Sequence, residues 1–185
     1  MSALKKVDNS SYTTKLYIGA STIKQLLWYV TNILFFKNAF CISSSLKVGL
    51  LRRFGAPVGK GVVIKPSVNI KYPWKLSIGN YAWIGEQVWI DNIADVRIGD
   101  HVCLSQGSLL LTGNHNYKKS GFDLMPGAIV LEQGVWIGAK AIVCPGVVCA
   151  SHAILSVGSV ANENLQPYGI YKGNPALKVG DRVIE

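Results

Sequence analysis

The chain has 185 residues, a length that fits one domain and is sufficient to bury a real core. Its 19 glycines and 7 prolines exclude a collagen-like or a disordered chain. The net charge is +9, and residues 1–75 hold 12 Lys and Arg but one acid, Asp8. This imbalance favours an anionic partner near the N-terminal part, such as membrane phosphates, a phosphorylated substrate or nucleic acid; the alternative is a basic surface that only aids solubility.

The first residues, MSALKKVDNSSY, are charged and polar, so we expect no secretory signal peptide. No pair of cysteines has CxxC spacing, and free thiols in a reducing cytoplasm are the simpler expectation. The cysteines are Cys41, Cys103, Cys144 and Cys149.

The segment TIKQLLWYVTNILFFKNAF, from Thr22 to Phe40, has the apolar spacing of a helix. Its apolar part is too short to span a bilayer, which needs about 20 residues. Aromatic residues within it and lysines and arginines around it favour a helix that lies in a membrane interface. A helix that packs on the rest of the protein, or on another subunit, explains the same pattern equally well.

From Val58 onward the pattern changes to a six-residue period. An aliphatic residue or Cys149 starts each hexad, and the fifth position is small or β-branched. Three short faces per coil predict a triangular parallel β-helix, in which each coil buries its apolar side chains against the next. The hexads start at Val58, Ile64, Ile70, Ile78, Ile84, Ile90, Ile98, Leu104, Leu110, Leu131, Ile137, Val143, Cys149 and Leu155.

The period is interrupted once, between Leu110 and Leu131. We interpret the extra residues as a loop inserted at about 112–128, and loops on rigid scaffolds commonly carry function. Of the three histidines, His101 and His152 occupy the fourth position of a hexad, where we expect exposed corner residues. Only His115 lies off the register, in the inserted loop.

We therefore expect an all-β chain with three parts. Residues 1–55 form a basic, amphipathic helical segment, residues 56–166 form the β-helix with its inserted loop, and residues 167–185 form a C-terminal extension.

Several segments together resemble the hexapeptide-repeat acyltransferases, and are most similar to exopolysaccharide O-acetyltransferases of the colanic-acid type. The resemblance spans about residues 15–183 and is carried by LLRRFGAPVGKGV, YPWKLSIG, VWIDNIADVRIGDHVCLSQGSLLLTGNHNY, VWIGAKAIVCPGV and YKGNPALKV. It implies a left-handed β-helix, a homotrimer with active sites between subunits, and acetyl-CoA as the acyl donor without a metal. General crossover rules favour the opposite hand, so the handedness is taken from the resemblance alone.

The resemblance places the catalytic base at His115. A sugar hydroxyl must lose its proton as it attacks a thioester, and an imidazole with a pKa of about 6.5 can accept that proton near neutral pH. Asn114 or Asn116 either orients the ring or forms turns, and we expect Tyr117 beside them to contact the acceptor.

We expect polar groups on the preceding coil, Glu86, Asp91 and Asn92, to face the acceptor. Galactoside-type relatives carry an Asn and an Asp that fall at Gly85 and Ile93 here, so a galactoside-like pocket is not supported.

The resemblance also implies a coenzyme A site. We expect Trp136, Gly138, Ala139, Ser156 and Ser159 to line the pantetheine tunnel. Phosphate contacts are expected from Lys172, Lys178 and Arg182. Glu163 stands where such relatives commonly carry a phosphate-contacting Lys, which leaves these contacts open.

The sequence thus favours a cytoplasmic, acetyl-CoA-dependent O-acetyltransferase that modifies a sugar hydroxyl of an exopolysaccharide, a capsule or a lipid-linked precursor, with contact to the inner membrane. The alternatives are a noncatalytic membrane-associated scaffold and an acyltransferase for another small hydroxyl or amino acceptor. A zinc enzyme needs three converging ligands, which histidines at separate corners do not supply. Nucleic-acid binding is disfavoured because the basic residues flank an apolar helix rather than line a groove.

Overall fold

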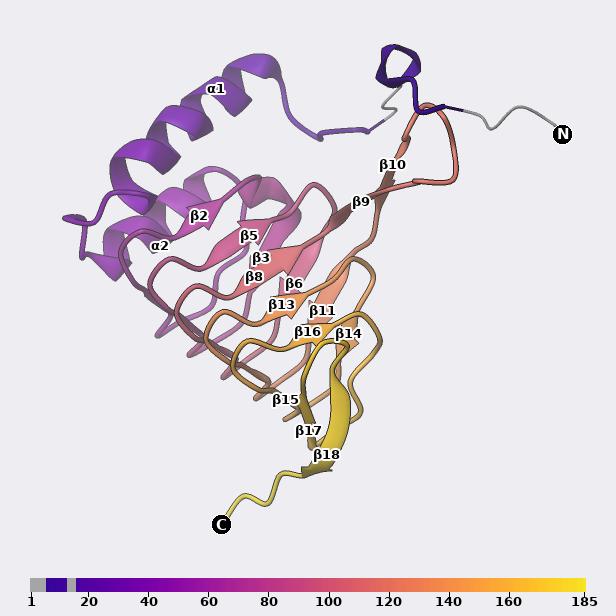
Figure 1. Cartoon of the computed structure of the whole chain (residues 1–185). Coiled ribbons are helices and arrows are strands. Elements are labelled where there is room, and N and C mark those ends of the chain that lie inside the picture. Colours follow the sequence, from indigo (N-terminus) through magenta and orange to yellow (C-terminus); the bar gives the residue numbers. More distant parts are fainter. Residues whose placement is uncertain (1–5, 13–15) are drawn as a thin grey trace, which may run out of the picture.

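The computed structural model describes residues 6–12 and 16–185. Lys5 and Lys15, counted above in the basic N-terminal part, lie outside these ranges. The expected fold class is confirmed: short parallel strands stack into a left-handed β-helix with helices at one end. Figure 1 shows the stacked coils, the helices over the first coil and a hairpin that projects from the prism.

The coils form three parallel sheets, here called A, B and C, one on each face of the prism. Sheet A contains β3 (Leu76–Ile78), β6 (Val96–Ile98), β11 (Ile129–Leu131) and β14 (Val148–Cys149). Sheet B contains β1 (Val63–Ile64), β4 (Trp83–Ile84), β7 (Cys103–Leu104), β12 (Trp136–Ile137), β15 (Ile154–Leu155) and β17 (Gly169–Lys172). Sheet C contains β2 (Asn69–Ile70), β5 (Trp89–Asp91), β8 (Leu109–Leu111), β13 (Ile142–Val143) and β16 (Val160–Ala161). Each coil runs from A to B to C, which defines an A–B edge, a B–C edge and a C–A edge.

The first positions of the hexads form the core in register. On sheet B, Ile64 pairs with Ile84, which pairs with Leu104, followed by Ile137 and Leu155. All five side chains are fully buried. Burial of one such side chain contributes about 1.5–3 kcal/mol, so the stacked columns are the main source of stability. The small side chains at the fifth positions, such as Ala82 and Ala141, are buried beside them.

The fourth positions turn the corners. His101 and His152 have φ values of 56° and 61°, and each stacks its ring on a tyrosine of a neighbouring coil. The expectation that both are corner residues is confirmed. Gly134 lies in the same column with φ 69°, and a Cβ there would lie 2.2 Å from the His152 ring, so the turn requires glycine.

Helices cover the open first coil. α1 (Thr22–Thr31) begins after Ser21, whose hydroxyl accepts from the Lys24 N–H, and continues as a π-helical turn (Asn32–Phe36). α2 (Ser44–Arg53) begins in the same way after Ser43. Trp28, Phe36 and Leu51 enter the core, so the expected packing of the helix on the protein is found for one of its faces.

The covering helices also satisfy the backbone of the first coil. No earlier coil donates hydrogen bonds to its strand carbonyls, and an unpaired sheet edge is a costly and aggregation-prone feature. Lys47 is fully buried, and its Nζ donates to the carbonyl of Lys65 at 2.8 Å and to that of Ile64 at 3.5 Å. The Trp28 indole donates to the carbonyl of Ile70, and Arg52 donates to that of Val58.

Two hairpins interrupt or end the coils. β9 (Gly113–His115) and β10 (Leu124–Pro126) form an antiparallel hairpin that leaves the C–A edge between β8 and β11. β18 (Leu177–Asp181) folds back on β17 at the last coil. Two short 3-10 helices, Asn9–Ser11 and Pro73–Lys75, complete the elements of the described ranges.

The buried ammonium of Lys47 gives a prediction about stability. Burial lowers the pKa of Lys47. The cost of burying its ammonium is offset by the hydrogen bonds that it donates to two backbone carbonyls. Replacement by Met keeps the apolar stem but leaves both carbonyls without this donor. We expect Lys47→Met to lower the free energy of unfolding by about 1–3 kcal/mol, measured by urea denaturation. Lys118→Met, at an exposed position, should change it by less than about 0.5 kcal/mol; equal stabilities would contradict the role given to Lys47.

Candidate active site

The projecting hairpin holds the imidazole of His115 in one orientation. Its Nδ1 lies 2.8 Å from the backbone carbonyl oxygen of Phe122. Because a carbonyl oxygen only accepts, Nδ1 must carry the proton and donate it. Nε2 of the neutral ring is then unprotonated and available to accept a proton from another molecule.

Aromatic contacts hold the same ring. The Phe122 ring stacks on His115 with centroids 4.5 Å apart and an interplanar angle of 6°. The ring of Tyr12, from the N-terminal segment, lies 5.9 Å from the imidazole at an angle of 47°. Neither residue was found by the sequence analysis, because nothing in the hexad pattern links residue 12 or 122 to the histidine.

The polar neighbours of His115 build the turn of the hairpin. The side-chain oxygen of Asn114 accepts from the backbone N–H of His115, and that of Asn116 accepts from Lys118. The contacts thus match the turn-forming alternative for both asparagines, and Phe122 orients the ring instead. Tyr117 is 76% exposed and is not held by the hairpin, which leaves it accessible to a ligand.

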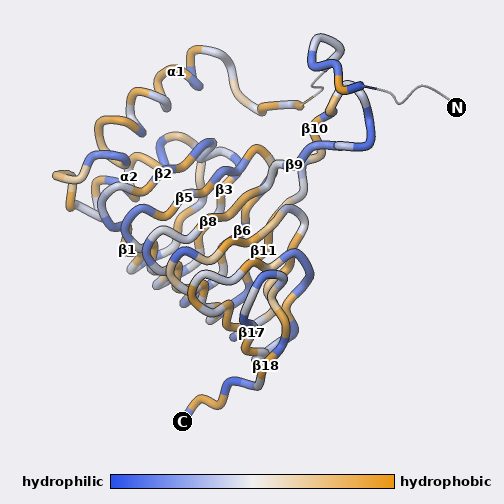
Figure 2. The backbone as a smooth tube through the Cα atoms, viewed as in Figure 1, coloured by the Kyte–Doolittle hydropathy of each residue, from blue (hydrophilic) through white to orange (hydrophobic). Residues whose placement is uncertain are grey.

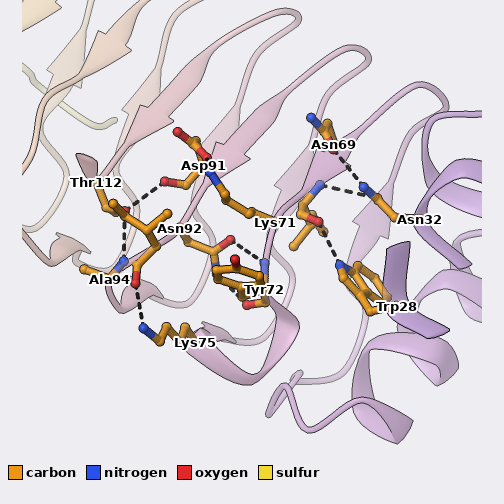
Figure 3. A network of polar contacts seen from close by, with 12 residues as sticks. Trp28, Asn32, Asn69, Lys71, Tyr72, Lys75, Asp91, Asn92, Ala94 and Thr112 are labelled. Carbon is orange, nitrogen blue, oxygen red and sulfur yellow. Dashed lines mark hydrogen bonds and ion pairs between the residues drawn. The ribbon is translucent and has the colours of Figure 1, made fainter. Parts of the chain in front are cut away.

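The predicted acceptor residues of the preceding coil fall at different places. Asp91 lies at the end of β5, and its carboxylate pairs with Lys71 at 2.9 Å (Figure 3). Asn92 is fully buried, and its amide donates to the backbone carbonyl of Tyr72 and accepts from the Tyr72 N–H. Neither amide atom of Asn92 is left for a sugar, which corrects the prediction for this residue. Glu86 is exposed on the B–C edge, away from the edge that carries the hairpin.

A groove of about 430 Å³ runs along the B–C edge. It brings together four of the residues predicted to hold coenzyme A: Trp136, Gly138, Ala139 and Ser156. Ser105, Gln106, Ile154, Leu155 and Val157 complete its lining. The Trp136 indole donates to the Ser105 hydroxyl at 2.9 Å, which fixes the ring at the wall of the groove.

Part of the backbone that lines this groove is already hydrogen-bonded between neighbouring coils. The N–H groups of Gly138 and Ser156 donate to carbonyls of the next coil, so these two N–H groups are not available to a ligand. Ser159 is 1% exposed, and its hydroxyl accepts from the Gly173 N–H. Its burial corrects the prediction that it faces the pantetheine.

The three predicted phosphate contacts are dispersed. Lys172 ends β17 and is exposed on the edge that carries the groove, where a phosphate is accessible to it. Lys178 pairs with Asp181 at 2.7 Å, and this hydrogen bond raises the pKa of Lys178. Arg182 donates to the backbone carbonyl of Gly134 on the A–B edge, so it joins the last strand to the prism and lies away from the groove.

The hairpin and the groove therefore lie on different edges of one prism. The hairpin leaves the C–A edge, the groove follows the B–C edge, and sheet C separates them (Figure 1). No residue that lines the groove belongs to the hairpin. A single chain thus does not bring His115 and Trp136 together.

The three cysteines of the β-helix offer little nucleophilic chemistry. Burial raises the pKa of Cys149 to about 12, and it raises the pKa values of Cys103 and Cys144 as well. Few thiolates form at neutral pH under these conditions. Within residues 6–12 and 16–185, no group of three or more His, Cys, Asp or Glu side chains is placed to hold a metal ion.

Relatives identify the family. The colanic acid biosynthesis acetyltransferase WcaF of Escherichia coli is 35% identical over 169 residues, which cover 91% of this chain and 93% of that protein. Galactoside O-acetyltransferase of Escherichia coli is 26% identical and covers 68% of this chain and 64% of its own length. No protein-family model matches the chain.

Solved structures agree on the fold. A hexapeptide-repeat-containing acetyltransferase from Vibrio cholerae superposes with a TM-score of 0.76 at 22% identity, covering 88% of this chain and 94% of its own. Galactoside acetyltransferase in complex with coenzyme A gives a TM-score of 0.74 at 20% identity, covering 86% and 80%. The fold and the sequence relatives define the class: the chain belongs to the hexapeptide-repeat acetyltransferase family.

The His115–Phe122 contact predicts one tautomer. We expect the neutral imidazole of His115 to carry its proton on Nδ1, detected from ¹⁵N chemical shifts of the labelled ring. His101 and His152 stack on tyrosines and serve as internal references. A proton on Nε2 of His115 would contradict the assignment, because that nitrogen must be free to act as a base.

Proposed function

We propose that the protein is an acetyl-CoA-dependent O-acetyltransferase that modifies a sugar hydroxyl of an exopolysaccharide, a capsule or a lipid-linked oligosaccharide precursor. One observation carries the proposal: the hairpin holds the imidazole of His115 by a contact of 2.8 Å between Nδ1 and the Phe122 carbonyl oxygen, which leaves Nε2 as the nitrogen that can accept a proton. The name of the Escherichia coli relative, which refers to colanic acid biosynthesis, supports a polysaccharide acceptor. A solved neighbour in complex with acetyl coenzyme A supports the donor.

In the proposed reaction, Nε2 of His115 accepts the proton of the acceptor hydroxyl while the hydroxyl oxygen attacks the thioester carbonyl. A tetrahedral oxyanion forms and then collapses, and the carbon–sulfur bond breaks. The imidazolium returns the proton to the departing thiolate, which leaves an acetyl ester, free coenzyme A and neutral His115. Direct transfer needs no acyl-enzyme, consistent with thiols whose pKa values are raised.

We further propose a homotrimer whose active sites lie between subunits. The separation of the hairpin from the groove on one prism supports this assembly. In such an assembly the C–A edge of one copy lies against the B–C edge of the next. The hairpin of one subunit then closes the neighbour's groove, which takes the pantetheine arm, and Lys172 is the remaining candidate for a phosphate contact.

A second part of the proposal concerns location. Among the described residues, no helix has the length and hydrophobicity that crossing a bilayer requires. α1 and the turn after it nevertheless present an exposed apolar stripe. Figure 2 shows that hydrophobic and hydrophilic residues alternate along α1. The stripe consists of Ile23, Leu27, Val30 and Leu34, which are between 46% and 73% exposed. With the basic residues around it, the stripe supports peripheral binding to the cytoplasmic face of the inner membrane.

The noncatalytic scaffold and the transferase for another small hydroxyl or amino acceptor remain the competing functions. The oriented imidazole argues against a scaffold, because a purely structural loop does not require a histidine ring held in one orientation. The chemical class of the acceptor distinguishes the proposed sugar O-acetyltransferase from a transferase for another small hydroxyl or amino acceptor. The assay below tests this class.

His115→Ala tests the base. We expect acceptor-dependent release of coenzyme A thiol to fall by ~10²–10⁴, while binding of acetyl-CoA, measured by calorimetry, is retained. The assay uses purified protein with nucleotide sugars, oligosaccharides, lipid-linked sugars and small amines. His101→Ala, at a corner of the prism, is the matched control and should keep full activity. Full activity of His115→Ala would refute the assignment.

The apolar stripe predicts binding to lipid. Leu27→Ser with Val30→Ser should abolish co-sedimentation with vesicles that contain anionic phospholipid, and salt should weaken binding of the native protein. These substitutions leave the net charge unchanged, so charge alone does not explain the loss. If the native protein fails to bind these vesicles, or if the variant loses its oligomeric state, the stripe is a subunit contact instead.

A further inference from the structure

A second groove lies under α1, on the outer face of sheet C. It has a volume of about 530 Å³, and we call it the α1 groove. One wall is the side of α1 that carries Leu26 and Tyr29, and the other is the surface of β2 and β5 with Asn69, Trp89 and Asp91. None of these residues lines the groove on the B–C edge.

α1 is fixed to the prism on one side only, which creates this space. The Trp28 indole donates to the carbonyl of Ile70 at 2.9 Å, and the Asn32 amide donates to the Asn69 side-chain oxygen at 2.8 Å (Figure 3). Residues 28 and 32 lie one helical turn apart on the face that meets the first coil. The first of these contacts is buried and the second is partly buried, so the wall formed by α1 is held in place without a ligand.

The lining has the chemistry that recognises carbohydrate. Tyr29 is 64% exposed and Trp89 is 46% exposed, so both rings offer flat apolar surface. Polar groups stand beside them: the Asn69 amide and the ion pair of Lys71 with Asp91. A pyranose presents C–H groups on its faces and hydroxyls on its rim, and a site of mixed aromatic and polar groups fits both.

The α1 groove leads to the root of the catalytic hairpin. The backbone carbonyl of Asp91 accepts from the hydroxyl of Thr112 at 2.8 Å and from the Thr112 N–H at 3.2 Å. Thr112 immediately precedes β9, which ends at His115. A chain that occupies the α1 groove and continues past Asp91 therefore reaches the edge from which the imidazole projects.

We infer that the α1 groove is an extended acceptor subsite, which holds sugar residues adjoining the one that is acetylated. The inference rests on the proposed function. The volume lies in the range of sites that hold drug-sized ligands and exceeds what a single sugar ring needs. The preferred acceptor is accordingly an oligosaccharide, free or lipid-linked, rather than a single sugar.

The test compares two tryptophans that face outward with nearly equal exposure. Trp89 lies in the α1 groove and Trp83 lies on sheet B, at 46% and 44% exposure. The probe is chemically deacetylated colanic acid, partially hydrolysed and separated into single sugars and longer oligosaccharides. For the longer fractions, Trp89→Ala should lower kcat/KM about fivefold through KM, because one aromatic contact contributes about 1 kcal/mol. Single sugars should be acetylated equally well by both proteins.

Trp83→Ala should match the native protein with every fraction, and Tyr29→Ala should repeat the Trp89→Ala result from the other wall. An equal effect of Trp89→Ala on single sugars and oligosaccharides would overturn the inference. Dissociation of the oligomer by Trp89→Ala, seen by sedimentation, would overturn it as well, since the residue would then be a subunit contact.

Saturation-transfer NMR with the same oligosaccharides, without acetyl-CoA, separates this inference from the proposed function. Trp89-dependent binding in the NMR experiment, together with no acetyl transfer in the activity assay, would support the groove and refute the acetyltransferase assignment. Transfer of acetyl groups without any dependence on Trp89 would refute the groove and leave the assignment in place.

Discussion

The stacking of one aliphatic side chain per face on the same position of the next coil is the constraint on which this structure depends. Ile84, Leu104 and Ile137 form one such column, and each loses its contacts if the register shifts by a single residue. The intervening residues have little freedom of length, because most successive starts lie six residues apart and the C–A edge takes at most two more in a regular coil. Extra chain can therefore leave the prism only as a separate element, and this is how the hairpin with His115 arises.

The same regularity leaves the first coil unfinished. Its carbonyls have no preceding coil, and the N-terminal helices provide donors that are unusual in a core, above all the buried ammonium of Lys47. Anchoring α1 by Trp28 and Asn32 places its remaining faces over sheet C and toward solvent. The α1 groove and the exposed apolar stripe are thus both consequences of how the β-helix is closed at this end.

The hexad pattern contains enough information to predict the coils, their register and the corners at His101 and His152, because each position is set by a repeat of contacts. It also locates the insertion, since an interruption is visible wherever a period is regular. The partners of His115 could not be predicted: Phe122 is brought back by the turn of the hairpin, and Tyr12 comes from the other end of the chain. Asn92 and Ser159 were predicted to contact ligands, but they do not. Their polar side-chain atoms are hydrogen-bonded to the backbone of neighbouring coils.

The distribution of the candidate site over two edges has a physical reason. Every coil returns to the same edges, so sheet C remains between the B–C groove and the root of the hairpin along the whole prism. The hairpin is anchored at its root by Thr112 and touched at its far end by the N-terminal segment, where the Asp8 N–H donates to the carbonyl of Ser120. Movement of the hairpin across sheet C would break both sets of contacts. The proposed trimer requires none of this movement, because in it the neighbour's groove would meet a hairpin that is already in place.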